Sequence, residues 1–315
     1  MGELIPFCVS MRLRFRGVTE RCGVLLQGSA GWGEFSPFEE YPPEVAARWL
    51  LAAEEAANEG WPRANRTEIP VNTTVPAVDG DTARRLVEGS GCTTVKVKVA
   101  EGDDVERVAA VRDALGPGGK IRIDANGGWT VGAAVTAIKQ LMTFDLEYVE
   151  QPVATLEEMA ELRKKVDVPL AADESVRTAD DPLRIAGLEA ADIVVLKVQP
   201  LGGVRRALEV ADACGLPVVV SSALETSVGI AAGVALAAAL PDLPYACGLG
   251  TVSLLDRDVT ASPLVPVNGM LPVRRAEPDA RALAQVQPDD RRASEWLKRL
   301  EDARRYIDKM DRTQR

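Results

Sequence analysis

The sequence contains no histidine among its 315 residues. This absence excludes the Ser-His-Asp triad, the Cys-His pair, imidazole zinc ligands and acid–base catalysis by histidine. The chain also has fewer basic residues (37) than acidic ones (47), which gives a net charge of −10 at pH 7 and argues against nucleic acid or an anionic membrane as its partner. Proton transfer near neutral pH would therefore depend on Lys, Asp, Glu, Tyr or Cys.

Cysteine and long apolar runs are also scarce. The five cysteines are widely spaced and contain no CxxC motif, so we expect free thiols in a reducing, cytoplasmic compartment: Cys8, Cys22, Cys92, Cys214 and Cys247. The first residues lack a basic segment followed by an apolar core, so we expect no export signal. The longest apolar run, residues 229–240, is shorter than the roughly 20 residues of a membrane span, and we expect it to be a buried helix.

The chain divides into two patterns. Before about residue 67 the sequence has the pattern of strands followed by a helix, which predicts a small α+β unit. From residue 69, short β-branched segments alternate with helix-like segments, and the polar residues that end consecutive segments are 23 to 26 residues apart. This pattern favours a parallel barrel over an open doubly wound sheet. The eight predicted strands are 69–74, 94–99, 121–124, 146–150, 169–172, 193–198, 218–221 and 245–248.

The repeating pattern ends after Gly250. We therefore predict a barrel over residues 68–250 and an α+β unit over residues 1–67 that is completed by about 251–315. Residues 289–309 have helical spacing of apolar side chains and predict an amphipathic helix that docks through Trp296, Leu300 and Tyr306.

Three successive predicted strands end in a carboxylate: Asp124, Glu150 and Asp173. The carboxyl ends of barrel strands open on one face, so these side chains should converge. Converging carboxylates repel one another and require a cation, and a set of hard oxygen ligands suits Mg²⁺, with Mn²⁺ as a second choice. The alternative is that each acid caps the following helix.

Lysines flank this acidic group. Lys96 and Lys98 lie two residues apart, and so on one face of a strand, and Lys197 ends the strand after the third acid. An ammonium group that is buried near a second ammonium group and a divalent ion should have a lowered pKa, which suits a base. The alternative is a lysine that extends to solvent at the sheet edge.

These motifs together resemble the enolase superfamily, and within it the lysine-base subgroup that contains the muconate-lactonising enzymes. The resemblance rests on the segments KVKV, DANGGW, EQP, DES, LKVQPLGG and SSALETSVG. It implies an α/β fold, a (β/α)7β barrel covered by an α+β capping domain. It also implies that Asp124, Glu150 and Asp173 bind Mg²⁺, that Asn126 supports these three ligands and that Lys98 is the base. The absence of histidine excludes the histidine-base branch.

Within the subgroup, the N-terminal segment and the GLGT sequence at residues 248–251 look most like o-succinylbenzoate synthases of the actinobacterial type. This resemblance implies a carbon–oxygen lyase of menaquinone biosynthesis that acts on a small carboxylate. Lys197 would stabilise the developing charge, Lys96 would tune Lys98, and Arg122 and the hydroxyls of Ser221 and Ser222 would bind substrate. Arg122 could equally form a salt bridge in the barrel core. Ser221 and Ser222 could equally belong to a turn at the end of the strand. A racemase of N-succinylamino acids or a muconate-type cycloisomerase is the alternative activity, and we expect a monomer or small homo-oligomer.

Two further features allow two interpretations each. Gly202 and Gly203 open a helix after a strand, where they would form either a phosphate site or, as we favour, a tight turn. Four arginines form a basic cluster in this acidic chain: Arg12, Arg14, Arg16 and Arg21. Alternation puts the first three on one strand face, which is either a solvated edge, as we favour, or an attraction for an anionic substrate.

Overall fold

Seven parallel strands form the larger sheet in a computed structural model that describes residues 2–15, 17–178 and 183–313. In spatial order they are β5 (Thr73–Val75), β6 (Thr94–Lys98), β7 (Lys120–Asp124), β8 (Leu146–Glu150), β9 (Leu170–Ala172), β10 (Ile193–Leu196) and β11 (Val218–Val220). The strands are rich in Val and Ile and are buried on both faces, as a parallel sheet requires. The predicted α/β class is confirmed.

The barrel closes through a short irregular segment. Cys247 bridges to Val71 and Gly248 bridges to Ser221, both in parallel register, and Gly248 N donates to the Val220 carbonyl at 2.8 Å. Two predicted strands are therefore only partly right. Residues 245–248 make isolated bridges instead of a strand, and residues 69–74 are divided into β4 (Glu68–Pro70) and β5 because β4 pairs antiparallel with β12 (Met270–Pro272).

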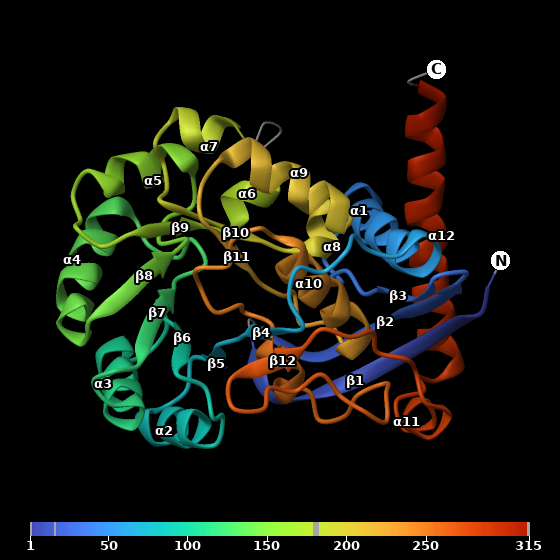
Figure 1. The fold of residues 1–315 in the computed structure, drawn as a ribbon, viewed down its shortest axis with the longest axis horizontal. Coiled ribbons are helices and arrows are strands. Elements are labelled where there is room, and N and C mark those ends of the chain that lie inside the picture. The colour runs from blue at the N-terminus through green and yellow to red at the C-terminus, as the bar shows by residue number, and fades with distance from the viewer. Residues whose placement is uncertain (1, 16, 179–182, 314–315) are drawn as a thin grey trace.

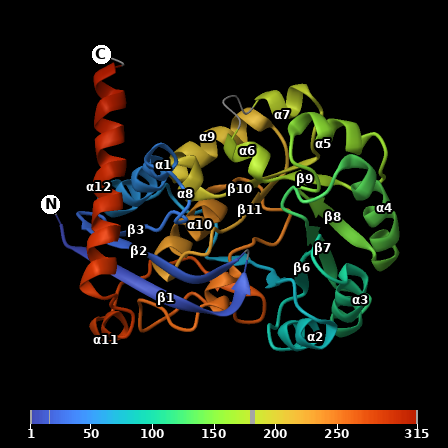
Figure 2. The same cartoon turned by 180° about the vertical axis from the view of Figure 1, so that it is seen from behind.

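Helices follow the barrel strands and surround the sheet (Figures 1 and 2). They are α2 (Gly80–Glu88), α3 (Asp104–Leu115), α4 (Val131–Leu141), α5 (Leu156–Arg163), α6 (Glu174–Thr178), α7 (Leu183–Gly187), α8 (Val198–Leu201), α9 (Val204–Cys214) and α10 (Ser227–Ala239), with a 3-10 turn, η2 (Met142–Phe144), after α4. The first four begin at side chains that accept a hydrogen bond from the first helical turn: Asp79, Asp103, Thr130 and Thr155. The predicted buried helix is confirmed, since α10 is buried from Ser227 to Ala238.

The second unit contains an antiparallel sheet of β1 (Leu4–Phe15), β2 (Val18–Gly28) and β3 (Gly31–Phe35). Helix α1 (Pro43–Glu54), which continues into the π-helical turn η1 (Glu55–Glu59), and helix α12 (Asp290–Thr313) pack on it. Trp49 of α1 and Trp296 of α12 are both fully buried in its core. In Figure 1, α12 stands along the side of the molecule that carries this sheet.

The residues after 250 connect the two units. They contain the 3-10 turn η3 (Gly250–Leu254), β12 and α11 (Ala280–Ala284). The backbone N–H of Asp256 donates to Ser10 of β1 at 2.9 Å, and Cys8 N donates to Val286 at 2.8 Å. Among the predicted anchors of α12, Trp296 and Leu300 are buried, but Tyr306 is only half-buried because the face at Ala303 and Ile307 packs instead. In the described part of the chain, no helix is both long and apolar enough to span a membrane.

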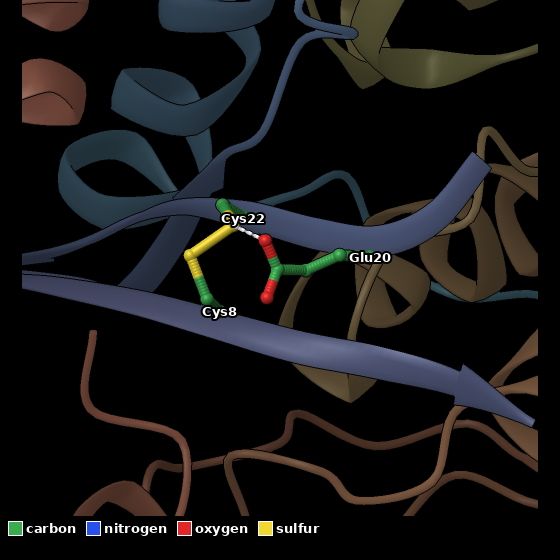
Figure 3. A group of neighbouring side chains, drawn as sticks. All are labelled: Cys8, Glu20 and Cys22. Atoms are coloured by element: carbon green, nitrogen blue, oxygen red, sulfur yellow. Dashed lines mark hydrogen bonds between the residues drawn. A yellow bond between two sulfur atoms is a disulfide. The ribbon is translucent and has the colours of Figure 1, made fainter. Parts of the chain in front are cut away.

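One cysteine prediction is wrong. Cys8 and Cys22 lie opposite each other on β1 and β2 and form a disulfide (Figure 3), while Cys92, Cys214 and Cys247 are free and buried. The scattered spacing did not reveal this pair because its proximity comes from the hairpin register. Glu20 Oε2 lies 3.3 Å from Cys22 Sγ, but both sulfurs are used in the disulfide, so this group offers no thiolate to a metal.

Candidate functional site

The predicted acids and lysines converge at the carboxyl ends of the barrel strands. Lys98, Asp124 and Glu150 are register partners across β6, β7 and β8. Asp173 directly follows β9 and Lys197 directly follows β10. The period-two alternation of strands therefore points one layer of charged side chains at a common mouth.

Each lysine contacts an acid of this layer. Lys96 Nζ lies 2.8 Å from Glu150 Oε1 and 3.3 Å from Asp124 Oδ2, although it belongs to the layer below. Lys98 Nζ donates to Asp124 Oδ2 and, at 2.7 Å, to Asn126 Oδ1. Lys197 Nζ donates to Asp173 Oδ2 at 2.5 Å. Three ammonium groups thus balance the charge of three carboxylates in the interior.

Burial and proximity shift the pKa values of this group in opposite directions. Burial lowers the pKa of Lys98, and nearby Lys96 adds to this effect while Asp124 opposes it. Burial also disfavours the charged form of Lys96, but Glu150 and Asp124 outweigh it and its pKa is raised. Burial raises the pKa of Glu150 to about 7, and repulsion from Asp124 contributes. Lys98 is thus the lysine of this pair whose environment favours the neutral form that a base requires.

The residues present fit a hard divalent cation. Asp124, Glu150 and Asp173 are buried carboxylates from three adjacent strands, and Glu150 Oε2 accepts no hydrogen bond from the described residues. Among the described residues, the carboxylate oxygens of these three acids do not all lie within 4.8 Å of one another. Each acid instead forms an ion pair with a lysine. The donor set is oxygen only, which suits Mg²⁺ or Mn²⁺.

Two polar residues next to the acids support the layer. Asn126 has a left-handed backbone, accepts from Lys98 and donates to Glu174 Oε1 at 3.2 Å. Gln151 was not singled out in advance, although it lies in the EQP motif. It is fully buried, its φ is 35°, and its Oε1 accepts from Asp173 N at 3.0 Å, which links the strand ends that carry two of the acids.

A small cavity of about 30 Å³ lies over the lysines. Its walls include all three lysines, Thr74, Gly248, Thr251, the loop from Ser221 to Leu224, and Phe15 and Phe38 from the other unit. Ser221 and Ser222 thus lie where they were predicted, although the Ser222 hydroxyl is already hydrogen bonded to Thr251 at 2.8 Å. A larger hollow of about 520 Å³ shares Phe15 and Lys98 with this cavity and also contains Arg14.

Arg122 does not line either hollow. It is fully buried, its Nε donates to Glu147 Oε2 at 2.6 Å, and its Nη1 donates to the carbonyl of Ala246 at 2.6 Å. Its guanidinium also lies 4.8 Å from the centre of the Tyr148 ring. The structure therefore places Arg122 in the barrel-core salt bridge, the alternative stated above.

The carboxylate of Glu55 binds the backbone at the start of α9, next to Gly202 and Gly203. Glu55 Oε2 accepts from Val204 N at 2.5 Å, and Oε1 accepts from Arg205 N at 3.1 Å. Gly203 has a φ of 137°, and a Cβ there would lie 2.4 Å from Glu55 Oε2. The favoured turn is present, and Glu55 occupies the position of the phosphate.

Comparisons with known proteins agree with this geometry. Residues 79–278 match the enolase C-terminal domain-like family and residues 7–57 match the enolase N-terminal domain-like family. The chain is 60% identical over 311 residues to an o-succinylbenzoate synthase of Thermobifida fusca, covering 97% of both chains. It is 52% identical over 307 residues to one of Mycolicibacterium smegmatis, covering 95% of this chain and 94% of that relative.

Solved structures show the same fold. The L-Ala-D/L-Glu epimerase of Bacillus subtilis superposes with a TM-score of 0.75 at 23% identity, covering 88% of this chain and 96% of that chain. The muconate cycloisomerase of Pseudomonas fluorescens has a TM-score of 0.75 at 21% identity, with 91% and 99% covered. The chain belongs to the o-succinylbenzoate synthase family of the enolase superfamily.

Proposed function

We propose that this protein is a carbon–oxygen lyase that removes water from 2-succinyl-6-hydroxy-2,4-cyclohexadiene-1-carboxylate to give o-succinylbenzoate for menaquinone biosynthesis. The observation that carries the proposal is a cavity lined by both Lys98 and Lys197, whose ammonium groups contact Asp124 and Asp173. The names of relatives at 60% and 52% identity support the substrate. We also propose that the protein is cytoplasmic, that it is a monomer or small homo-oligomer, and that the barrel domain extends from residue 68 to residue 250.

Lys98 is the proposed base. Its neutral form removes the ring proton next to the carboxylate, and burial lowers the pKa of the amine, which favours that form. Hydrogen bonds to Asp124 and Asn126 hold the amine in place. The protonated Lys98 then donates to the departing hydroxide, so that proton removal and water loss occur on one face of the ring.

Lys197 and the acids have electrostatic roles. Lys197, held by Asp173 at 2.5 Å, places a positive charge on the wall of the cavity and stabilises the charge that develops on the substrate carboxylate. Asp124, Glu150 and Asp173 would hold Mg²⁺, which when bound supplies a Lewis acid for the carboxylate oxygens. Lys96 balances the charge of Glu150 and Asp124 from below.

The test is turnover of the dehydration substrate by the purified protein with Mg²⁺, before and after treatment with a chelator. We expect o-succinylbenzoate to form, chelation to abolish its formation, and added Mg²⁺ to restore it. Lys98→Ala should reduce kcat by at least about 10³-fold, whereas Lys120→Ala, which removes an exposed lysine of β7, should change it little. Deuterium exchange into N-succinylamino acids without any dehydration would overturn the proposal in favour of the racemase.

A further inference from the structure

The loop between β11 and α10 forms one wall of the cavity over the lysines. Ser221, Ser222, Ala223 and Leu224 all line it, together with Lys98 and Lys197. Leu224 has a φ of 66°, a left-handed conformation that costs a branched side chain energy. The surrounding contacts must therefore hold this loop in its shape.

A glutamate from the capping sheet contacts the end of this loop. Glu34 of β3 is 3% exposed, and its Oε2 accepts from the Thr226 hydroxyl at 2.5 Å and from Gly229 N at 2.9 Å. Its Oε1 accepts from Thr226 N at 3.2 Å and from the Ser36 hydroxyl at 2.7 Å. Strand β3 and helix α10 are neighbours in Figure 1, so one capping-domain carboxylate binds the residue at which the loop becomes a helix.

An arginine of the same sheet contacts the middle of the loop. Arg21 is 3% exposed; its Nε donates to the Leu224 carbonyl at 3.1 Å and its Nη2 donates to the Ser36 carbonyl. Its guanidinium lies 4.3 Å from the centre of the Phe38 ring, which also lines the cavity. Arg21 is therefore buried. Arg12 and Arg14 are exposed, as expected for a solvated strand edge, and Arg16 lies outside the described residues.

The close approach of Glu34 depends on a glycine. A Cβ on Gly229 would lie 3.0 Å from Glu34 Oε2 and 2.5 Å from the Cβ of Glu225. Glu225 in turn folds back so that both of its oxygens accept from Ala223 N, at 2.9 and 3.0 Å. The carboxylates of Glu34 and Glu225 and the guanidinium of Arg21 thus fix the loop at residues 223, 224 and 226.

We propose that Glu34 is a positioning residue for the dehydration, acting through Thr226 to hold the 221–226 loop against bound substrate. The inference rests on the proposed function, because it assumes that substrate binds against this wall of the small cavity and extends into the larger hollow that shares Lys98. Glu34 lines neither hollow and moves no proton in the reaction. Loss of its contacts should therefore weaken substrate binding more than it slows the chemical step.

The experiment compares steady-state kinetics of Glu34→Gln with those of the natural chain. We expect KM to rise about tenfold and kcat to fall by less than about threefold, because the amide nitrogen of Gln cannot accept the hydrogen bonds that Glu34 Oε2 accepts from Thr226 and Gly229. The dissociation constant of o-succinylbenzoate, measured by calorimetry, should rise in parallel. Glu39→Gln is the matched control, since it makes the same change at an exposed carboxylate of the capping domain and should leave both constants unchanged.

A second pair of variants tests the same contact from the barrel side. Thr226→Val removes the hydroxyl that donates to Glu34, whereas Thr226→Ser retains it, so only Thr226→Val should raise KM. This pair decides the question if Glu34→Gln fails to fold by circular dichroism. An unchanged KM in folded Glu34→Gln, or a fall in kcat at constant KM, would overturn the inference. Absence of dehydration by the natural chain would instead overturn the proposed function.

Discussion

The ammonium group of Lys197 lies 2.5 Å from Oδ2 of Asp173, and both side chains are at least 94% buried. The residue proposed to stabilise developing charge is therefore held by a residue proposed to bind Mg²⁺. A buried charge that loses a partner is costly, so removal of either side chain would penalise the charge of the other.

Replacing Lys197 should reduce the rate of the dehydration. We expect Lys197→Ala to lower kcat by about 10²-fold or more, the loss typical of one preorganised charge contact. Lys197→Arg keeps the charge but not the geometry, and should recover only part of this loss. Turnover of the dehydration substrate measures both effects, with Lys120→Ala as the control. Turnover of Lys197→Ala at the natural rate would remove Lys197 from the mechanism.

The disulfide between Cys8 and Cys22 should stabilise the capping sheet. It closes a loop with a sequence separation of 14 residues, for which chain entropy predicts roughly 3 kcal/mol. We expect the double substitution Cys8→Ser and Cys22→Ser to lower the free energy of unfolding by about 2–3 kcal/mol, measured in urea without reductant.

Thiol titration of the denatured protein provides the direct check. Three reactive thiols are expected before reduction and five after it, because Cys92, Cys214 and Cys247 are free. A count of five without reductant would show that the pair is not oxidised in solution. In that case the double substitution should have little effect on unfolding.

The barrel and its charged layer were predictable because the repeat period and the alternation of side chains along a strand are local properties of the sequence. Lys98, Asp124 and Glu150 end strands of five residues each, so parity alone placed them on one face. Arg122 shares this parity with Asp124 but lies one layer lower, where Glu147 and the Ala246 carbonyl accept its donors. Parity gives the face of a residue and not its partners, so the role of Arg122 stayed open.

The contacts between the two units, and the pairing of Cys8 with Cys22 inside one of them, could not be predicted in this way. Glu34, Glu55 and the Cys8–Cys22 pair have partners set by docking or hairpin register, and Glu34 and Glu55 bind backbone amides 149 to 195 residues away. No spacing rule connects positions so distant. The only local sign was the pair Gly202–Gly203, which predicted either a phosphate site or, as favoured, a tight turn at the start of α9.

The close contact between Gly203 and Glu55 predicts a large effect of a small substitution. Gly203→Ala would place its Cβ 2.4 Å from Glu55 Oε2 at a φ that non-glycine residues rarely adopt. We expect the free energy of unfolding to fall by about 2 kcal/mol or more. The control is Gly132→Ala in α4, where a Cβ meets no atom within 4 Å and alanine should be neutral or stabilising. Equal stability of the two variants would contradict the proposed packing of Glu55 on α9.

Burial of Glu34 predicts a specific dependence of stability on pH. Burial raises its pKa from 4.5 to about 7, with a contribution from Glu225, while hydrogen bonds from Thr226 and Ser36 oppose the shift. The folded state then binds a proton more tightly than the unfolded state, so this residue favours folding at pH 4.5 and loses that contribution as the pH rises to about 7. Arg21, whose own pKa is lowered by burial, is the nearby cation.

Glu34→Gln cannot titrate and should remove this contribution. We expect the difference in free energy of unfolding between the natural chain and Glu34→Gln to change by roughly 3 kcal/mol between pH 4.5 and 7, with the natural chain losing stability relative to the variant as pH rises. Urea unfolding at several pH values measures it, and Glu39→Gln corrects for the general change in charge. A difference that stays constant over this range, or one of opposite sign, would show that hydrogen bonds to the Glu34 carboxylate outweigh the cost of burying its charge.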